Sequence, residues 1–411
     1  MTFMSKQYDI IVYGASSFVG QILTQYLSCH LTGKSEIKWA LAGRNKAKLA
    51  QVQASTETKD IDVIIADASD SRSLDTLCRQ AKVIISTVGP YALYGEPLIK
   101  SCVENGTDYV DLTGEVQWID RMLKKYEEKA KKSGSRIINC CGFDSIPSDM
   151  GAYFLQQQAQ LRFGQAVPAT KMAVKKIRGG TSGGTIASVI NLAKEAIIDP
   201  SLRKKLLDPY LICPDSNQHS KNNLDNSSVF FDSEFDAWTT PFIMAGINTR
   251  VVFRTNTLMN YAYGKDFQYS EVMLTGNKSG SKLNAKGMAF GIKAFLVLAA
   301  MAPSRWFLEK YLVPKPGEGP TPKEQEEGFF DIRHLGKTED GEIIEIKVTG
   351  DKDPGYGSTG KMLAQAALCL ANDVGAEEKG GGFWTPASIF GSKLITRLEA
   401  HAGLTFELVD K

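Results

Sequence analysis

The stretch from Asp9 to Gly20 constrains the fold most, because an apolar run there meets two glycines and then opens into a helical pattern. The run through Tyr13 is typical of a buried strand, and the spacing of apolar residues changes to that of a helix across the turn. Gly14 suits a tight turn, and Gly20 lets the helix pack closely on the strand. Unpaired N–H groups at the start of such a helix bind phosphate, so the sequence predicts a dinucleotide-binding turn.

The turn departs from the usual glycine pattern, because Ser17 stands where an extended version of the motif has its middle glycine. Ser16 and Ser17 are small enough for a phosphate to approach the backbone closely. An ordinary strand–turn–helix, with glycines needed only for chain geometry, stays open as the alternative.

The ends of the next two strands indicate which dinucleotide binds. The second predicted strand, 37–42, ends in Gly43 and Arg44. An acidic residue at this position usually holds the ribose hydroxyl of NAD, whereas arginine accommodates the 2′-phosphate of NADP. Arg44 therefore predicts NADP, with a solvated arginine in a basic turn as the alternative. Asp67 follows the third strand, 61–66, and either contacts the adenine or helps to cap the next helix.

The fourth predicted strand, 83–87, runs directly into the loop 88–91. Ligands of open parallel sheets gather at the carboxyl ends of the strands, so this loop is expected to face the nicotinamide. Strands at 109–111 and 136–140 follow, each after a helical pattern. Six strands that alternate with helices predict an α/β fold with an N-terminal, doubly wound parallel Rossmann sheet.

Composition narrows the function classes. The chain of 411 residues balances 48 lysines and arginines against 46 acidic residues, so its net charge does not indicate a nucleic-acid partner. Its seven cysteines form no C-x-x-C pair and its four histidines lack metal-ligand spacing, so neither a redox pair nor a metal site is expected. The residues before the first strand lack the apolar core of a signal peptide, which predicts a cytoplasmic protein.

The second half of the chain has a different residue pattern, with a glycine-rich loop and a long polar segment. A strand is predicted at 171–175, and a glycine-rich loop, 178–185, precedes the next helix. Because glycines have no side chain, a substrate or the nicotinamide could approach the backbone N–H groups of this loop closely. A flexible hinge or a glycine-rich turn between domains would explain the glycines as well. A polar segment, 211–236, is expected to form a long loop or lid.

Alternating apolar residues predict the strands of a second sheet. Strands are expected at 249–254 and 267–274, and a hairpin is expected from the strands 329–334 and 343–348, with a tight turn between them. These strands predict a second, mixed α/β domain that is built on an antiparallel sheet.

Three domains are expected from these patterns. Residues 1–165 form the NADP-binding Rossmann domain, and residues 166–358 form an α/β domain for substrate binding or dimerisation. Residues 359–411 form C-terminal helices that pack back on the Rossmann domain. A homodimer is compatible with this organisation.

The most apolar segment, 287–302, is shorter than the ~20 residues of a membrane-spanning helix and contains Lys293, so a transmembrane helix is not expected. One interpretation is a buried helix. The other is an interfacial helix, or one that contacts an acyl chain, helped by Trp306 and Phe307 just beyond it. The sequence therefore allows a peripheral membrane or lipid contact beside a small-molecule or acyl, lipid-like substrate.

Seven motifs run through almost the whole chain in order: Gly14–Gly20, Ala42–Arg44, Thr87–Tyr91, Tyr109–Glu115, Gly142–Asp149, Gly179–Thr185 and Asp353–Tyr356. Together they resemble the saccharopine dehydrogenase-like oxidoreductase family, which includes the trans-acting enoyl reductases. The resemblance implies an NADP-binding Rossmann domain and a mixed α/β domain for substrate. It does not imply a role in lysine metabolism, because the family name reflects similarity to one reductase and not a shared substrate.

The resemblance also implies which residues bind the cofactor. Those carried over are Gly14, Ser16, Ser17, Phe18, Gly20 and Arg44 and, at the nicotinamide end, Thr87, Gly89 and Pro90. Val19 and Val88 lie between these positions, and Asp67 joins them at the adenine end. Ser17 departs from the threonine–glycine version of the turn, but a serine there should still bind phosphate.

These features predict an NADP(H)-dependent oxidoreductase that reduces a C=C bond, such as an enoyl group, in an acyl or lipid-like substrate. The candidate catalytic residues are Tyr91, Tyr94 and Asp144, which lie beyond strand ends. Packing of the tyrosines and capping of a helix by Asp144 are the structural alternatives. The Tyr-x-x-x-Lys pair of short-chain reductases does not stand out in the expected region.

Two other functions stay open. A catalytically silent NADP-binding sensor would keep the Rossmann turn and use the second domain to bind protein. A saccharopine-type imine reductase would need cations for substrate carboxylates, and Arg178, Arg250 or Arg254 could serve. The long second domain with its own glycine-rich loop favours the enzyme over the sensor.

Overall fold

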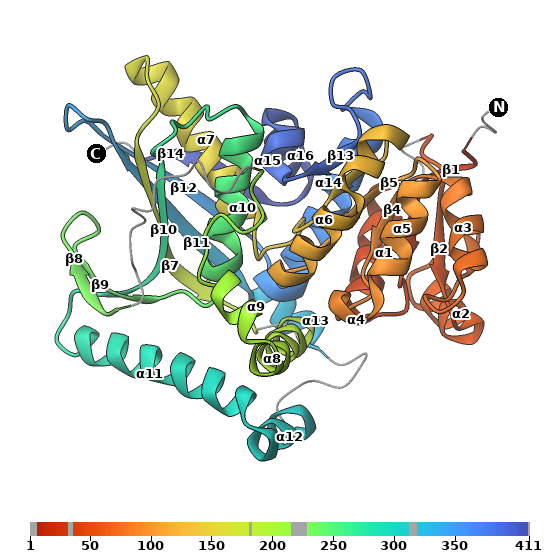
Figure 1. The fold of residues 1–411 in the computed structure, drawn as a ribbon, viewed down its shortest axis with the longest axis horizontal. Coiled ribbons are helices and arrows are strands. Elements are labelled where there is room, and N and C mark those ends of the chain that lie inside the picture. The colour runs from red at the N-terminus through yellow and green to blue at the C-terminus, as the bar shows by residue number, and fades with distance from the viewer. Residues whose placement is uncertain (1–5, 32–35, 181–182, 215–227, 312–318, 410–411) are drawn as a thin grey trace.

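The strands of the protein form two sheets of seven described strands each. The computed structural model describes residues 6–31, 36–180, 183–214, 228–311 and 319–409. The two sheets lie side by side in the molecule (Figure 1), with the N-terminal sheet and its helices on the right of that view.

The first sheet is a parallel Rossmann sheet with the order β3-β2-β1-β4-β5-β6-β13. Its strands are β1 (Tyr8–Tyr13), β2 (Trp39–Gly43), β3 (Asp62–Ile65), β4 (Ala81–Ser86), β5 (Asp108–Asp111), β6 (Arg136–Ile138) and β13 (Gly382–Trp384). Ile10, Ile11 and Val12 in β1 are completely buried, as expected for a strand with both faces of its sheet covered. The predicted doubly wound parallel sheet is confirmed.

Helices from both ends of the chain pack on this sheet. They are α1 (Phe18–Leu31), α2 (Lys46–Ser55), α3 (Ser71–Gln80), α4 (Tyr91–Tyr94), α5 (Glu96–Glu104), α6 (Val116–Ser133) and α14 (Thr359–Asn372). The strand order reverses between β1 and β4, and open α/β sheets bind ligands in the crevice at such a switch point. The carboxyl ends of β1 and β4 therefore locate the candidate site.

The second sheet has the order β14-β12-β11-β7-β10-β9-β8. Its strands are β7 (Ala169–Arg178), β8 (Phe230–Asp232), β9 (Ala237–Pro241), β10 (Gln268–Gly276), β11 (Phe329–Lys337), β12 (Ile343–Gly350) and β14 (Leu404–Leu408). The predicted hairpin is confirmed as β11 and β12. β7 and β10 pair in parallel, whereas the other neighbours are antiparallel, so the sheet is mixed.

The helices of the second half are α7 (Ile146–Phe163), α8 (Gly183–Ile198), α9 (Pro200–Lys205), α10 (Ala245–Leu258), α11 (Ser281–Ala300), α12 (Ala302–Tyr311), α13 (Pro322–Glu327), α15 (Pro386–Phe390) and α16 (Ser392–His401), with a π-helical turn η2 (Pro354–Ser358). Helices α8, α11 and α12 form a layer that we call the helical cap. Ile190, Ala299 and Leu308 form a small apolar cluster in this cap, separate from the main core.

The segment 249–254, predicted as a strand, lies inside helix α10. Val251, Val252 and Phe253 are consecutive apolar residues, and periodicity alone cannot assign such a short run to a strand or a helix. The structure buries all three, together with Arg250 and Arg254, where α10 packs against α7, α15 and β10. Burial on several sides of one helix therefore explains a run that resembles a strand.

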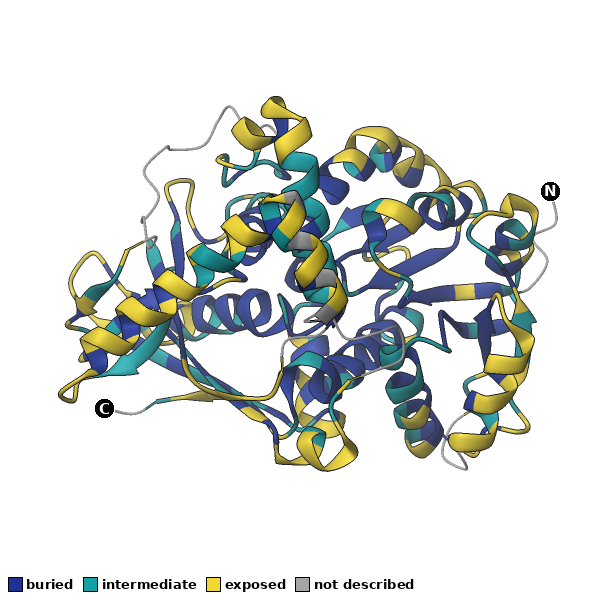
Figure 2. Ribbon diagram, turned by 90° about the horizontal axis from the view of Figure 1, so that it is seen from below, coloured by how far each residue is buried: buried dark blue, intermediate teal, exposed yellow. Residues whose placement is uncertain are grey.

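The buried-helix interpretation of segment 287–302 is wrong. Helix α11 has the length and hydropathy of a membrane-spanning helix, but only 17% of its most apolar window is buried. Figure 2, which shows the molecule from below, has α11 and α12 in front with mostly exposed residues. The prediction failed because apolar periodicity shows which residues share a helix face but not whether other elements cover that face.

The C-terminal region 359–411 contributes to both sheets. Helix α14 packs on β4 and β5, and β13 extends the first sheet, but β14 pairs with β12 at the edge of the second. The short alternation of Leu404 and Phe406 did not reveal β14 in the sequence. Of the predicted polar loop 211–236, residues 215–227 lie outside the described residues, and β8 forms near its end.

Two buried carboxyl groups link the elements around α7. Asp149 accepts hydrogen bonds from Thr255 Oγ1 and from the Ala387 N–H, and burial raises its pKa to about 7. Glu271 accepts a hydrogen bond of 3.0 Å from Asn248 Nδ2, and burial raises its pKa to about 7 as well. These bonds hold α7, which follows the last strand of the Rossmann series, against α10 and the second sheet.

Candidate cofactor and substrate site

The turn between β1 and α1 depends on its two glycines. Gly14 has φ +89°, and a Cβ atom there would lie 2.6 Å from Thr87 Oγ1. A Cβ atom on Gly20 would lie 2.3 Å from the Gly14 carbonyl oxygen. Both positions therefore exclude other side chains, which allows α1 to begin directly against the end of β1.

Ser17 holds the turn and leaves backbone donors available. Its N–H donates to the Gly14 carbonyl oxygen at 2.8 Å, and its Oγ accepts from the Gly20 N–H at 2.9 Å and lies 2.9 Å from Thr87 Oγ1. The N–H groups of Ser16, Phe18 and Val19 have no acceptor within the described part of the chain. Such orphan donors at a helix start bind anions, so the turn fits a pyrophosphate.

The Phe18 side chain points away from these donors. Its ring meets the Tyr356 ring edge-on, with centroids 4.8 Å apart, and a Cβ atom on Gly319 would lie 2.2 Å from it. Phe18 therefore offers its N–H to the cofactor turn, while its ring joins that turn to η2.

Arg44 and Asp67 lie at the adenosine end of the predicted site. Arg44 is exposed just beyond β2 and has no ion-pair partner among the described residues. Asp67 Oδ1 accepts from the Ser69 N–H at 2.9 Å and from Ser69 Oγ at 2.8 Å, and these bonds lower the pKa of Asp67. The capping of α3 is performed by Asp70, which accepts from the Arg72 N–H. Contact of Asp67 with adenine stays a prediction.

Glu115 lies at the predicted nicotinamide end of the site, and the sequence analysis assigned it no role. Its carboxylate accepts from the N–H groups of Tyr91 and Ala92 at 2.7 and 3.0 Å, and from Ser188 Oγ at 2.9 Å. Burial raises the pKa of Glu115, whereas these bonds oppose that shift. The carboxylate thus links the start of α4, which directly follows Pro90, to α8. An acidic residue beyond β5 was the only signal of this contact.

The two candidate tyrosines occupy different environments. Tyr91 is buried against Trp118, and its hydroxyl donates to the Ser86 carbonyl oxygen at 2.9 Å and accepts from the Leu112 N–H at 3.4 Å. Tyr94 lies at the other end of α4, where it is 48% exposed. The Tyr91 hydroxyl is thus engaged by backbone groups at the ends of β4 and β5, and a catalytic role for either tyrosine stays a prediction.

Asp144 lies beyond β6 at that edge. Its Oδ2 would be 3.8 Å from a Cβ atom built on Gly114, which follows β5, and Met244 borders the same point. Burial raises the pKa of Asp144 to about 6, and a hydrogen bond with Thr185 opposes the shift. The structure therefore joins Asp144 to the first turn of α8, so that a titratable carboxyl lies next to Gly114, beyond the carboxyl ends of β5 and β6.

The glycine-rich loop is tied to the same edge through η2. The Gly183 N–H donates to the Tyr356 hydroxyl at 2.8 Å. Asp353 accepts from the N–H groups of Tyr356 and Gly357 at 3.0 and 2.9 Å, which fixes η2. Residues 181–182 of the loop lie outside the described residues. The motif at Asp353–Tyr356 thus positions the start of α8.

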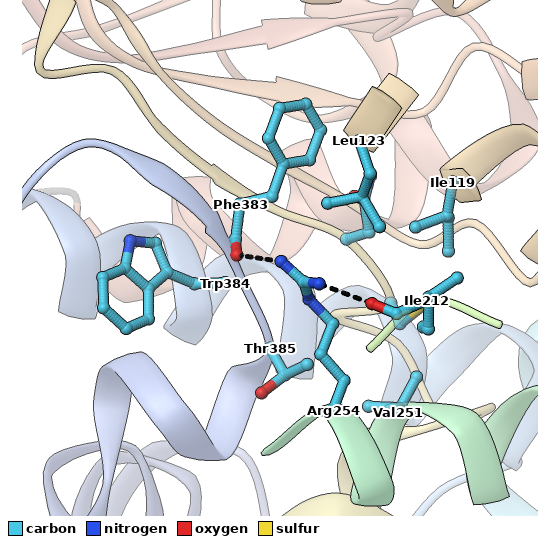
Figure 3. A pocket seen from close by; sticks show the side chains of 10 residues that line it. Ile119, Leu123, Ile212, Val251, Arg254, Phe383, Trp384 and Thr385 are labelled. Atoms are coloured by element: carbon cyan, nitrogen blue, oxygen red, sulfur yellow. Dashed lines mark hydrogen bonds between the residues drawn. The ribbon is translucent and has the colours of Figure 1, made fainter. Parts of the chain in front are cut away.

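The three arginines considered as carboxylate binders are all engaged with the protein. Arg178 pairs with Glu327. Arg250 donates to the carbonyl oxygens of Asp208 and Leu206. Arg254 is buried beside a small hollow, where its guanidinium donates to the carbonyl oxygens of Ile212 and Phe383 (Figure 3). These contacts hold α10 to the preceding loop and to β13.

A family model of the saccharopine dehydrogenase NADP-binding domain matches residues 10–138. A protein of Mycobacterium tuberculosis named "Putative trans-acting enoyl reductase" is 35% identical over 99% of each chain. The chain belongs to the saccharopine dehydrogenase-like oxidoreductase family. The trans-acting enoyl reductases of Mycobacterium bovis and Mycobacterium ulcerans are 33% and 31% identical and cover 96% and 97% of each chain. Apo saccharopine dehydrogenase (L-Glu forming) of Saccharomyces cerevisiae shares the fold, with a TM-score of 0.55 at 15% identity over 98% of this chain and 100% of that one.

Membership in this family confirms the resemblance that the motifs indicated. The chain is an NADP-binding oxidoreductase, and NADP is the cofactor of its first domain. The matched residues extend from β1 to β6 and so contain the turn at Gly14, the end of β2 at Arg44 and the loop at Gly89. The roles of the individual residues in cofactor binding stay predictions.

Arg44→Ala is expected to weaken NADPH binding by about 10- to 100-fold and to leave NADH binding nearly unchanged. A charge-assisted contact with the 2′-phosphate contributes roughly 1.5–3 kcal/mol, and NADH lacks that phosphate. Fluorescence titration of both cofactors measures the effect. Arg162→Ala, which removes an exposed arginine on α7, is the matched control. Equal losses for both cofactors would contradict the assignment of Arg44.

Proposed function

We propose that this protein is an NADPH-dependent reductase of an activated C=C bond in an acyl or lipid-like substrate. The proposal rests on the carboxyl group of Asp144. This group forms a hydrogen bond with Thr185 beside the carboxyl edge of the NADP-binding sheet. Relatives at 31–35% identity carry the name trans-acting enoyl reductase, which supports an enoyl group as the acceptor.

The chain's own residues account for the negative charge that develops in such a reduction and for the proton that completes it. When bound, NADPH would supply a hydride to the carbon β to the carbonyl group, and negative charge would develop on the carbonyl oxygen. The first turn of α8, with its positive helix end, supports that oxygen. Asp144 donates a proton to the α carbon, which completes the saturated product and leaves the Asp144 carboxylate.

The contacts of the arginines argue against the saccharopine-type alternative. An imine reductase for amino-acid substrates needs cations that are available to carboxylates. The guanidinium groups of Arg250 and Arg254 instead donate hydrogen bonds to backbone carbonyl oxygens inside the protein. Arg178 forms an ion pair with Glu327. An uncharged acyl substrate needs no such cation.

Stopped-flow fluorescence of NADPH tests the proposal. The purified protein is mixed with NADPH and then with a panel of enoyl thioesters, enones and imines. Oxidation of NADPH by an enoyl substrate, with a saturated product in the mass spectrum, is the expected result. Tight NADPH binding without turnover of any panel member would favour the sensor, and turnover of imines alone would favour the saccharopine-type reductase.

A further inference from the structure

Helix α11 fully buries only small residues and exposes most of its large ones, although Phe295 is half-buried against Ile190, Ala299 and Leu308. Its buried residues are Ser281, Ala285, Ala289 and Ala299. Leu283 and Phe290, in contrast, are 74% and 75% exposed, and Val297 is 58% exposed. These three residues recur every seven positions, so they lie along one side of the helix. A helix that served only to complete the fold would place its large apolar side chains inward.

The exposed apolar side continues into α12. Met301, Trp306 and Phe307 are all more than half exposed. Together with Leu283, Phe290 and Val297 they form what we call the outer apolar face. Contiguous apolar surface of this kind marks a site of interaction with a protein or a membrane.

Basic residues border the outer apolar face. From position 278 to position 300 the chain contains the basic residues Lys278, Lys282, Lys286 and Lys293 and no acidic residue. Lys282, Lys286 and Lys293 are exposed and lie on one side of α11, between the buried stripe and the outer apolar face. A cationic border around an apolar face complements the anionic headgroups and the acyl chains of a phospholipid bilayer.

The packing of α11 excludes a spanning orientation. Its buried stripe contacts α8, β9 and β10, so one side of the helix stays attached to the second domain. Lys286 and Lys293 lie within the helix and would have to enter the hydrocarbon layer if it spanned a membrane. A helix that lies in the plane of the interface satisfies both constraints, because its lysines then reach the headgroups.

We propose that the helical cap docks on the surface of an anionic phospholipid bilayer through the outer apolar face. The same cap borders the candidate site, since α8 contacts Asp144 through Thr185 and Glu115 through Ser188. Docking therefore attaches to the bilayer the same helical cap that contacts Asp144 and Glu115. The docking itself does not depend on the proposed reaction.

Vesicle co-sedimentation of the full chain tests the docking. The wild type is expected to bind vesicles of roughly equal phosphatidylcholine and phosphatidylglycerol, and to bind pure phosphatidylcholine vesicles more weakly. Phe290→Ser should lower the affinity for the anionic vesicles roughly tenfold, because Phe290 loses its apolar contact with the acyl chains. Leu161→Ser, which replaces a residue that is 80% exposed on α7, is the matched control and should bind like the wild type.

Charge reversal separates the electrostatic part of the binding. Lys286→Glu combined with Lys293→Glu should remove the preference for anionic vesicles. The control is the same charge change at Lys59 and Lys132, two exposed residues of the Rossmann half outside the helical cap, and it should keep the preference. Failure of the wild type to sediment with anionic vesicles overturns the proposal, and so does unchanged binding of Phe290→Ser. Self-association that Phe290→Ser abolishes, without any vesicle binding, would assign the face to a second copy of the chain and overturn it as well.

Discussion

Gly20→Ala is expected to weaken NADPH binding by about 100-fold or more. A Cβ atom at this position would lie 2.3 Å from the Gly14 carbonyl oxygen and 2.9 Å from backbone atoms of Ala15. Backbone atoms cannot rotate out of the way, so α1 must move off the turn, and overpacking of this kind costs about 1–3 kcal/mol of stability. The movement misaligns the N–H groups of Phe18 and Val19, which are the donors offered to the pyrophosphate.

Gly246→Ala is the matched control for this change. Gly246 lies in helix α10, and a Cβ atom there would meet nothing within 4 Å. The control should keep NADPH affinity and gain up to about 1 kcal/mol of stability from the better helix propensity of alanine. Fluorescence titration measures binding, and circular dichroism shows that both variants are folded. If a folded Gly20→Ala variant binds NADPH with wild-type affinity, the turn does not bind the cofactor.

The Rossmann half was predictable because its signals are local. A buried parallel strand is apolar throughout, its helix follows at once, and the glycine spacing of the turn between them is visible within a few residues of sequence, as at Gly14 and Gly20. Each strand from β1 to β6 could therefore be identified from its own stretch of sequence. β13 could not, because its three residues gain their partner, β6, from far away in the chain.

The second half was harder to predict because tertiary contacts decide it. The run at Val251 to Phe253 became helical since α10 is buried on several sides, and α11 stayed mostly exposed since the residues that it buries fully are small. β7 and β10 pair in parallel, which requires a crossover connection between them. The alternation of apolar and polar residues along a strand does not show which strands pair or in which direction. Apolar patterning identifies a buried or exposed side only after the packing partners are known.

The site shows the same division between local and long-range signals. The cofactor turn followed from its glycines, whereas Glu115 acts through N–H groups of α4 and through Ser188 of α8, which are distant in the sequence. The sequence indicated Asp144 only as a carboxyl group at a strand end. Its contact with Thr185 appeared once α8 was placed over the edge of the sheet.

Asp144→Asn is expected to lower kcat for enoyl reduction by about 100- to 10,000-fold, with little change in NADPH affinity. This is the usual contribution of a proton donor that acts in the transition state. Burial raises the pKa of Asp144 to about 6. Since the protonated form is the active one, the wild-type rate should fall about tenfold per pH unit above that pKa, and the variant should lack this dependence.

Loss of folding cannot explain such a result. The folded-state pKa of Asp144 is raised above its ordinary value of 3.8, so its contribution to stability is lost as the pH rises from about 4 through about 6. The amide of the Asp144→Asn variant would stay neutral, so the variant should be no less stable than the wild type above that range. Glu271→Gln, at another buried carboxyl group, is the control for a general effect of removing a buried acid and should keep kcat.

Thr185→Val separates proton donation by Asp144 from a purely structural role. The hydrogen bond with Thr185 lowers the pKa of Asp144, so its removal should move the alkaline limb of the rate profile to higher pH. The same variant keeps the carboxyl group and should therefore stay active at low pH. If Thr185→Val and the wild type lose activity at the same pH, the titrating group is not Asp144, and the proton of the reduction must come from another donor.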